Sequence, residues 1–199
     1  MKRSRPAAFT LIELLVVIVI IAVLMGLAFP VFSSIQNQAK KTQAKNDLTQ
    51  IVTAVNAFYT EYGKYPTTAA NDAAATYGSS NSNKLLFDEL RGVINALNTR
   101  QIVFISPADA KDPANPRNGI AGATSAKAGE YFDPWGTAYS ISIDWDYDNQ
   151  VTNPYTADSG AGPAKIRQGV IAWSWGKDQR GGSAAKTSTD SNDDVISWQ

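Results

Sequence analysis

Hydrophobic residues are concentrated in one continuous run near the start of the chain. Residues 14–35, LLVVIVIIAVLMGLAFPVFSSI, contain no charged side chain. A helix of this length rises about 33 Å at 1.5 Å per residue, which is enough to cross the roughly 30 Å apolar layer of a bilayer. A secretory signal peptide has a shorter apolar core. The pattern therefore predicts a membrane-spanning helix.

The helical pattern continues beyond residue 35, but there it becomes one-sided. Apolar residues recur at intervals of three and four, the spacing of a single buried helix face. These residues are Leu48, Ile51, Val52, Val55, Phe58, Tyr59 and Tyr62. Gly63 and Pro66 then supply a stop signal. The sequence predicts one helix from Phe9 to Tyr62 whose second half is covered by another layer.

The remaining residues predict a small α+β head. Loops are expected over 67–83 and 107–130, a short helix over 84–98 and a buried strand over 102–106. The segment DPWGTAYSISID supplies a turn at 133–136 followed by an alternating strand, and GVIAWSWG over 169–176 supplies a partner strand. We expect these strands to form a C-terminal antiparallel sheet that packs on the long helix.

Composition and charge restrict the function. Lysine plus arginine equals aspartate plus glutamate, at 18 each, which argues against a nucleic-acid partner. The chain has no histidine and no cysteine, which excludes Ser-His-Asp and Cys-His nucleophiles, imidazole or thiolate metal sites, and disulfides. We expect a protein that is not an enzyme, with no catalytic residues.

Charged residues at the N-terminus suggest an orientation and a processing event. Lys2, Arg3 and Arg5 precede the apolar run, so the positive-inside bias keeps this end in the cytoplasm and places the rest outside. Glu13 lies at the edge of the apolar run, where a carboxylate is costly unless it has a partner. A cut between Ala8 and Phe9 would create an α-amino group four residues ahead of Glu13, able to neutralise the Glu13 of a neighbouring subunit.

The string A-F-T-L-I-E-L-L-V-V resembles the cleavage and methylation signature of type IV prepilins and of the pseudopilins of type II secretion systems. The resemblance implies that a prepilin peptidase cuts between Ala8 and Phe9 and that Phe9 is then N-methylated. It implies assembly roles for Phe9, for Glu13 as the fifth mature residue, and for Pro30 as a helix-breaking proline. Ala8 departs from the usual glycine before the cut.

Three later strings, D-P-W-G-T-A-Y, W-S-W-G-K-D and D-D-V-I-S-W, are similar to turns of the major pseudopilins. The resemblance implies a pilin-like structural subunit of a periplasmic pseudopilus that drives type II protein secretion. Implied partners are further copies of the chain, the prepilin peptidase, an inner-membrane assembly platform and minor pseudopilins, with the C-terminal domain in the periplasm. The implied divisions are a cleaved leader 1–8, a transmembrane or filament-core half-helix 9–35, an amphipathic half-helix 36–63, variable loops 64–132, and a sheet with a calcium-loop tail 133–199.

Two other functions remain open at this point. A type IV pilin or minor pilin of a surface filament has the same leader and helix. A membrane-anchored carbohydrate-binding or hydrolase domain with a pilin-like leader is a third possibility, because aromatic side chains stack on sugars. Five tryptophans are available for this: Trp135, Trp145, Trp173, Trp175 and Trp198.

Resemblance to the major pseudopilins also implies calcium in the C-terminal tail. Asp178 and Asp194 match the expected carboxylates, and Asp190, Asn192 and Asp193 offer further oxygens of the kind calcium prefers.

An alternative calcium site is Asp144, Asp146 and Asp148, which match the first three ligand positions of an EF-hand loop. The match is incomplete, because Asn149 and Tyr155 replace its glycine and glutamate.

Overall fold

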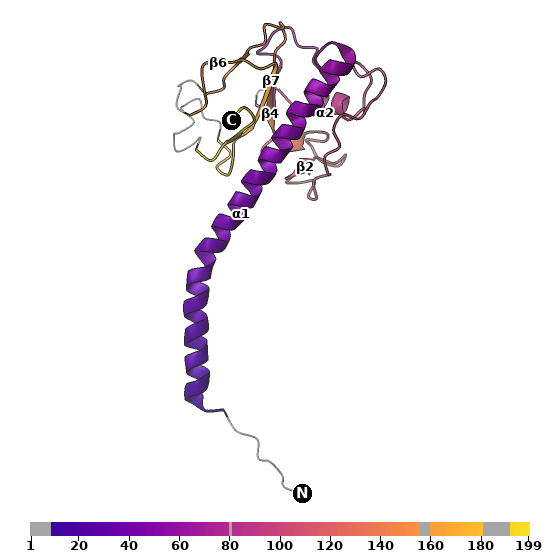
Figure 1. The fold of residues 1–199 in the computed structure, drawn as a ribbon. Coiled ribbons are helices and arrows are strands. Elements are labelled where there is room, and N and C mark those ends of the chain that lie inside the picture. Colours follow the sequence, from indigo (N-terminus) through magenta and orange to yellow (C-terminus); the bar gives the residue numbers. More distant parts are fainter. Residues whose placement is uncertain (1–8, 80, 156–159, 181–191) are drawn as a thin grey trace. The chain divides into compact units, whose positions relative to one another are not determined.

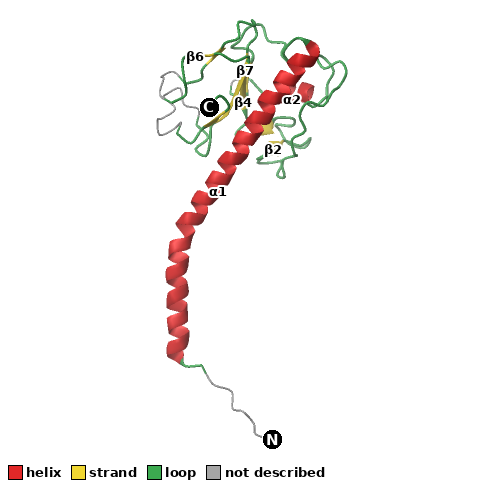
Figure 2. Cartoon of the chain, in the orientation of Figure 1, coloured by secondary structure: helices red, strands yellow, loops and turns green. Residues whose placement is uncertain are grey.

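The computed structural model describes residues 9–79, 81–155, 160–180 and 192–199, and only the backbone of residues 27–31 (Figure 1). The chain divides into two compact units, one that ends at Ala39 and one that comprises residues 40–199, which we call the head. Helix α1, Leu11–Tyr62, contributes to both. The long N-terminal helix and the antiparallel sheet confirm the predicted α+β class (Figure 2).

Helix α1 begins two residues later than predicted and ends where predicted. Gly63 follows Tyr62 with a φ of 67°, and its backbone N–H donates to the Tyr59 carbonyl at 2.8 Å. This left-handed conformation favours glycine and closes the last helical turn.

Judged by length, hydropathy and charge together, none of the described helices qualifies to cross a membrane. The membrane-spanning helix predicted over residues 14–35 is therefore not confirmed. That range includes residues 27–31, whose side chains lie outside the described residues.

The sheet of the head is covered by the second half of α1 (Figure 1). Its strand order is β1-β4-β7-β8, with antiparallel neighbours throughout. Its strands are β1 (Thr76–Tyr77), β4 (Ser140–Ile143), β7 (Val170–Ser174) and β8 (Val195–Ile196). Leu48, Ile51, Val55 and Phe58 are fully buried in the cluster that also holds Ile141 and Ala172. These four residues of the predicted stripe are thus the core face of the head, while Val52 and Tyr62 are partly buried beside it and Tyr59 is exposed.

A second apolar cluster covers the other face of the sheet. It contains Ile171 and Trp173 of β7 and Tyr155 and Ile166 from the excursion between β4 and β7. This excursion carries a small hairpin, β5 (Val151–Thr152) with β6 (Lys165–Ile166). Ile141 and Ile143 lie in the cluster with α1, as the alternation predicts, and because the other face is also covered, every residue of β4 is buried.

The predicted turn at 133–136 is confirmed and is held by a buried carboxylate. One Asp133 oxygen accepts the backbone N–H groups of Trp135, Gly136 and Thr137 at 2.7 to 2.9 Å. Its other oxygen accepts the Ser174 hydroxyl of β7 at 2.5 Å. This aspartate therefore ties the turn to the central strand pair. The turn follows a further small hairpin, β2 (Gly119–Ile120) with β3 (Tyr131–Phe132).

The middle of the chain differs from the prediction. Helix α2, Lys84–Leu90, is shorter than the predicted 84–98, because Gly92 adopts a left-handed conformation with a φ of 68° and the Val93 N–H donates back to the Asp88 carbonyl at 2.9 Å. Beyond this stop, the Glu89 carboxylate accepts the backbone N–H groups of Leu97 and Asn98. No strand forms over 102–106, since the Phe104 N–H donates to the Leu90 carbonyl instead of to a sheet. The predicted loops 67–83 and 107–130 include the short strands β1 and β2.

One buried carboxylate on α1 makes the stability of the head depend on pH. Asp47 accepts the Tyr139 hydroxyl at 2.7 Å, and both side chains are buried. Burial raises the pKa of the Asp47 carboxyl above its ordinary value, while hydrogen bonds from Tyr139 and Tyr131 oppose the rise. The folded state therefore favours the protonated form, and ionisation of Asp47 removes stability as the pH rises from the unfolded pKa to the folded one.

Replacing Asp47 by asparagine keeps an acceptor for Tyr139 and removes the charge. We expect the stability of Asp47→Asn relative to the natural protein to increase with pH above about pH 4, near the unfolded pKa of aspartate, and then to level off. Asp47→Leu leaves the Tyr139 hydroxyl without this acceptor and is expected to lose about 1–3 kcal/mol. Urea unfolding from pH 3 to 8 measures both effects, and a pH-independent difference for Asp47→Asn would contradict the account.

Candidate functional site

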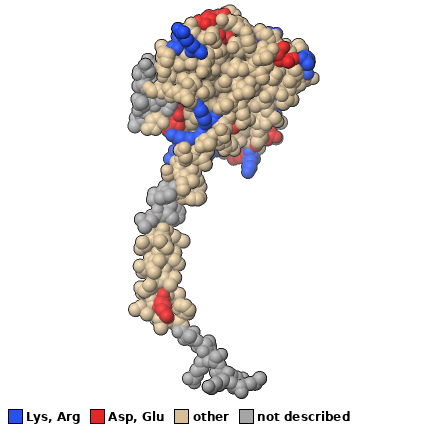
Figure 3. All heavy atoms as spheres, in the orientation of Figure 1, with Lys and Arg blue, Asp and Glu red and all other residues tan. Residues whose placement is uncertain are grey.

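The unit that ends at Ala39 presents apolar side chains on every side of α1. The exposed residues include Leu11, Ile12, Leu14, Leu15, Ile18, Ile20, Val23, Leu24 and Met25. Glu13 is the only charged residue from Phe9 to Ala39, and Figure 3 shows how few charged atoms this helix carries compared with the head. A helix that is apolar all round is normally buried, and apolar patches of this extent mark interaction sites. We call the exposed apolar surface of residues 11–26 the N-terminal apolar surface.

Glu13 has a local role that the sequence analysis missed. Its carboxylate accepts the Thr10 backbone N–H at 2.8 Å and the Thr10 hydroxyl at 2.7 Å, while the Thr10 hydroxyl accepts the Glu13 N–H at 3.3 Å. This reciprocal pair is a capping box, whose T-x-x-E pattern is visible in the sequence. It explains why α1 begins at Leu11 and not at Phe9.

Of the predicted processing residues, Phe9 lies beside this cap. Phe9 is 83% exposed and precedes Thr10 directly. Ala8 and the basic leader lie outside the described residues. Pro30 lies within α1, but its side chain is also outside the described set. Glu13 is exposed, so its carboxylate is accessible to the α-amino group of a neighbouring copy. That contact stays a prediction.

Three of the predicted calcium ligands meet where β7 ends and β8 begins. Asp178, Asp193 and Asp194 each place a carboxylate oxygen within 4.8 Å of the others. We call these three residues the C-terminal acidic cluster. Two calcium ligands on opposite sides of one ion are separated by roughly 5 Å, twice the calcium–oxygen distance. The spacing thus fits a single ion. Asn192 is exposed, and Asp190 lies outside the described residues.

Hydrogen bonds and a close approach of two backbone segments hold the C-terminal acidic cluster together. One Asp193 oxygen accepts the backbone N–H groups of Lys177 and Asp178. Asp194 is buried and accepts the Tyr155 hydroxyl at 2.7 Å. Gly176 has a φ of 67°, and a Cβ placed on it would stand 2.6 Å from the Asp193 carbonyl oxygen. The close approach of the two chain segments therefore requires glycine.

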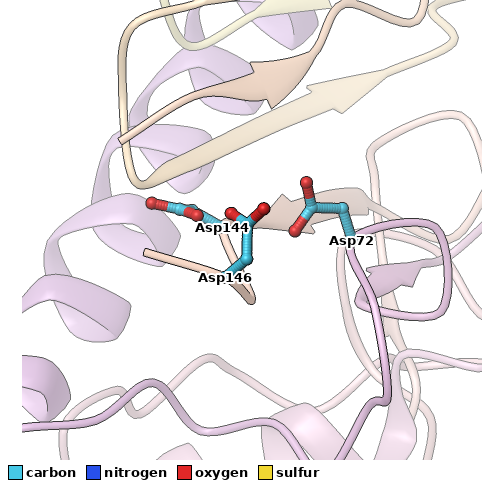
Figure 4. Close-up of side chains that lie close together, drawn as sticks. All are labelled: Asp72, Asp144 and Asp146. Carbon is cyan, nitrogen blue, oxygen red and sulfur yellow. The ribbon is translucent and has the colours of Figure 1, made fainter. Parts of the chain in front are cut away.

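Of the alternative calcium ligands Asp144, Asp146 and Asp148, the structure brings only the first two together. Asp144 and Asp146 meet Asp72 from a distant loop, with carboxylate oxygens within 4.8 Å of one another (Figure 4). Asp72 also accepts the Trp145 backbone N–H at 2.8 Å. The Asp148 oxygen instead accepts the Gln150 N–H. Asp72 could not be found from the sequence, because nothing in its loop pattern links it to a segment about seventy positions away.

Backbone hydrogen bonds stabilise the loop around Asp144. The two Asp144 oxygens accept the backbone N–H groups of Asp148 at 3.2 Å and Asn149 at 2.8 Å. Burial raises the pKa of the Asp144 carboxyl above its ordinary value, and the hydrogen bond from Asn149 opposes this. Its oxygens thus have backbone donors as partners, as one Asp193 oxygen of the C-terminal acidic cluster also does.

The tryptophans do not form a sugar-stacking platform. Trp135 and Trp173 are buried. Trp175 and Trp198 are partly buried and pack against the second apolar cluster. Trp145 exposes 39% of its surface. Four of the five are therefore packing residues, as is usual for aromatic residues in and beside strands.

Comparisons with known proteins confirm the resemblance of the N-terminus. Residues 3–29 match the family model described as the prokaryotic N-terminal methylation motif. The chain is 40% identical over 68 residues to type II secretion system core protein G of Pseudomonas aeruginosa, covering 34% of this chain and 48% of that protein. The protein of the same name from Aeromonas hydrophila is 32% identical over 68 residues, with the same coverage.

A further relative is the type IV major pilin protein PilA of Myxococcus xanthus, 39% identical over 61 residues, which are 31% of this chain and 28% of PilA. The chain thus matches about half of the length of each protein G and less than a third of PilA. No solved structure matches the chain. The chain carries a methylation motif and is similar to both a secretion protein G and a type IV pilin.

Gly176 provides a test of the geometry around the C-terminal acidic cluster. Gly176→Ala adds a Cβ in a left-handed conformation, which costs roughly 1–2 kcal/mol, and forces it against the Asp193 carbonyl. We expect a lower melting temperature and faster proteolysis after residue 176. Gly122→Ala is the matched control, because a Cβ there meets no atom within 4 Å. Equal stability of the two variants would contradict the role assigned to Gly176.

Proposed function

We propose that this chain is a structural subunit of a pilus-like filament, and specifically of a periplasmic pseudopilus that drives type II protein secretion. The N-terminal apolar surface carries the proposal. It exposes large apolar side chains all around the helix and has one charge, so it requires burial by other molecules. Further copies of the same chain are the proposed partners.

The methylation motif supports a specific route to this filament. A prepilin peptidase removes residues 1–8, the α-amino group of Phe9 is methylated, and an inner-membrane platform assembles the mature subunits with minor pseudopilins. Cleavage removes Lys2, Arg3 and Arg5 and leaves Glu13 as the only charged side chain before Lys40. The head then lies in the periplasm.

A type IV pilin of a surface filament is the second candidate function. The similarity to PilA of Myxococcus xanthus favours it, whereas the similarity to two proteins G favours the pseudopilus. The length of the filaments in electron micrographs separates the two functions.

Within the filament, we propose that the Glu13 carboxylate pairs with the α-amino group of a neighbouring copy. The capping box leaves Glu13 exposed, so an incoming cation has access to it. The charge of Glu13 and its capping function can be separated experimentally, since glutamine also completes a capping box.

Glu13→Gln keeps the cap but removes the charge, and we expect it to be produced normally and to assemble poorly. Glu13→Val loses both and is expected to assemble no better. Thr10→Val removes the hydroxyl half of the cap and leaves the carboxylate, so we expect most filament yield to remain. Yields are measured from sheared filaments by electron microscopy and immunoblotting.

Intact-mass measurement provides the processing control for each variant and should show the loss of eight residues and the gain of one methyl group. Normal assembly of Glu13→Gln would contradict the ionic role of Glu13. A natural protein that still begins at Met1 would contradict the peptidase assignment.

We also propose that the C-terminal acidic cluster binds calcium. Asp178, Asp193 and Asp194 would hold the ion, whose charge would offset three carboxylates that the fold brings together. A ligand that binds the native state alone stabilises it by RT ln(1 + [L]/Kd), about 2.7 kcal/mol at a hundredfold excess over Kd. Calcium would therefore fasten the tail to the end of β7.

We expect calcium to raise the melting temperature of the full chain in non-ionic detergent, and magnesium to raise it less, because magnesium prefers a smaller octahedral shell. Asp178→Asn, at an exposed ligand, should remove most of the shift. Asp146→Asn is the control in the other cluster and should retain it. Identical melting in calcium and in chelator would contradict the site, and the reverse variant pattern would move it to Asp72, Asp144 and Asp146.

A further inference from the structure

A cavity on the head brings together two cationic side chains. It has a volume of about 540 Å³ and is lined by Arg117, Lys127, Trp135 and Gln179, among others. No aspartate or glutamate is among its described lining residues. This wall is therefore positively charged in a chain whose formal net charge is zero.

Neither cation is neutralised by an ion pair with a described residue. The Lys127 ammonium lies 5.4 Å from the centroid of the Phe132 ring, a cation–π contact that leaves its donors free for a ligand. Asp112 interacts electrostatically with Arg117, and both residues also line a neighbouring hollow together with Asp109. The Asp112 carboxylate accepts the Ala114 N–H at 2.9 Å. Both cations thus retain hydrogen-bond donors to offer.

The turn at 133–136, which Asp133 stabilises, contributes Trp135 and Gly136 to the lining of this cavity. Gly136 has a φ of 103°, and a Cβ on it would stand 3.2 Å from the Arg117 Cγ and 3.3 Å from its Nε. The absence of a side chain at Gly136 lets the Arg117 chain lie closely over the turn. The Gln179 amide, from another lining residue, donates to the Trp135 carbonyl at 2.6 Å. Arg117 therefore packs on the turn that Asp133 ties to β7.

Trp135 is a lining residue whose indole nitrogen sits below the surface. Its indole nitrogen is buried and has no hydrogen-bond acceptor among the described residues. Buried donors normally have partners, and Trp135 shares this exception with Trp173, which lies outside the cavity. The cavity thus combines two positive charges with no carboxylate among its described lining residues.

We propose that this cavity binds an oxyanion, a carboxylate or a phosphate group, between Arg117 and Lys127. The planar guanidinium of Arg117 presents paired donors to two oxygens of such a group, and the Lys127 ammonium supplies a second charge. This site is separate from the N-terminal apolar surface and from the C-terminal acidic cluster, so it does not depend on the proposed filament role.

The test titrates the full chain in non-ionic detergent with citrate or with inorganic phosphate, at constant ionic strength maintained with chloride. The readout is the NMR signal of the Trp135 indole N–H, assigned by its loss in Trp135→Phe. We expect a saturable shift with at least one probe. Arg117→Gln and Lys127→Gln should each weaken binding at least about tenfold.

Lys165→Gln removes the same charge from an exposed position on β6 and should change affinity less than about twofold. Asp112→Asn should strengthen binding, because it removes the negative charge near Arg117. Saturation by citrate alone identifies a carboxylate ligand, such as an acidic protein segment, and saturation by phosphate alone identifies a phosphate ligand. A linear shift with both probes, or equal weakening by Lys165→Gln, would overturn the proposal.

Discussion

The head depends on the contact between one face of α1 and the pair β4 and β7. Leu48, Ile51, Val55 and Phe58 fill this interface, and neither layer would be stable alone, because an isolated amphipathic helix or a small sheet exposes its apolar face to water. Hydrogen bonds attach other parts of the head to α1 and to these strands. Asp133 ties its turn to β7, and Lys45 on α1 donates to the Ile196 carbonyl of β8 at 2.7 Å, which holds the C-terminal tail.

The two halves of α1 differ in how their apolar residues are arranged. In its second half the apolar residues form one stripe, and the sheet of the same chain covers it. In its first half they surround the helix, and the described residues of the chain provide no cover for the N-terminal apolar surface. A surface of this kind is costly in water, so the chain needs partners to complete it. This requirement is the physical basis of the proposed filament role.

Periodic features were predicted well from the sequence, and features that depend on distant contacts were not. The stripe of α1, its stop at Gly63 and the pairing of β4 with β7 follow from local spacing and turn chemistry. The early end of α2 has a local signal in Gly92 that was overlooked, whereas the hydrogen bonds from Leu97 and Asn98 to Glu89 depend on the folding of the loop. Asp178 and Asp194 were predicted as neighbours through motif resemblance, whereas Asp72 joins Asp144 and Asp146 only through the tertiary fold. The capping box of Thr10 and Glu13 was present in the sequence but was overlooked beside the intermolecular interpretation of Glu13.

The most direct test of the account is the accessibility of the N-terminal apolar surface in intact filaments. The chain has no cysteine, so a single introduced thiol reports on one position. Ile18→Cys lies on this surface, and Lys165→Cys lies at an exposed position of the head. In sheared filaments a maleimide reagent should label Lys165→Cys readily and Ile18→Cys only after denaturation. Equal labelling of both thiols in intact filaments would show that copies of the chain do not bury this surface, and would contradict the account.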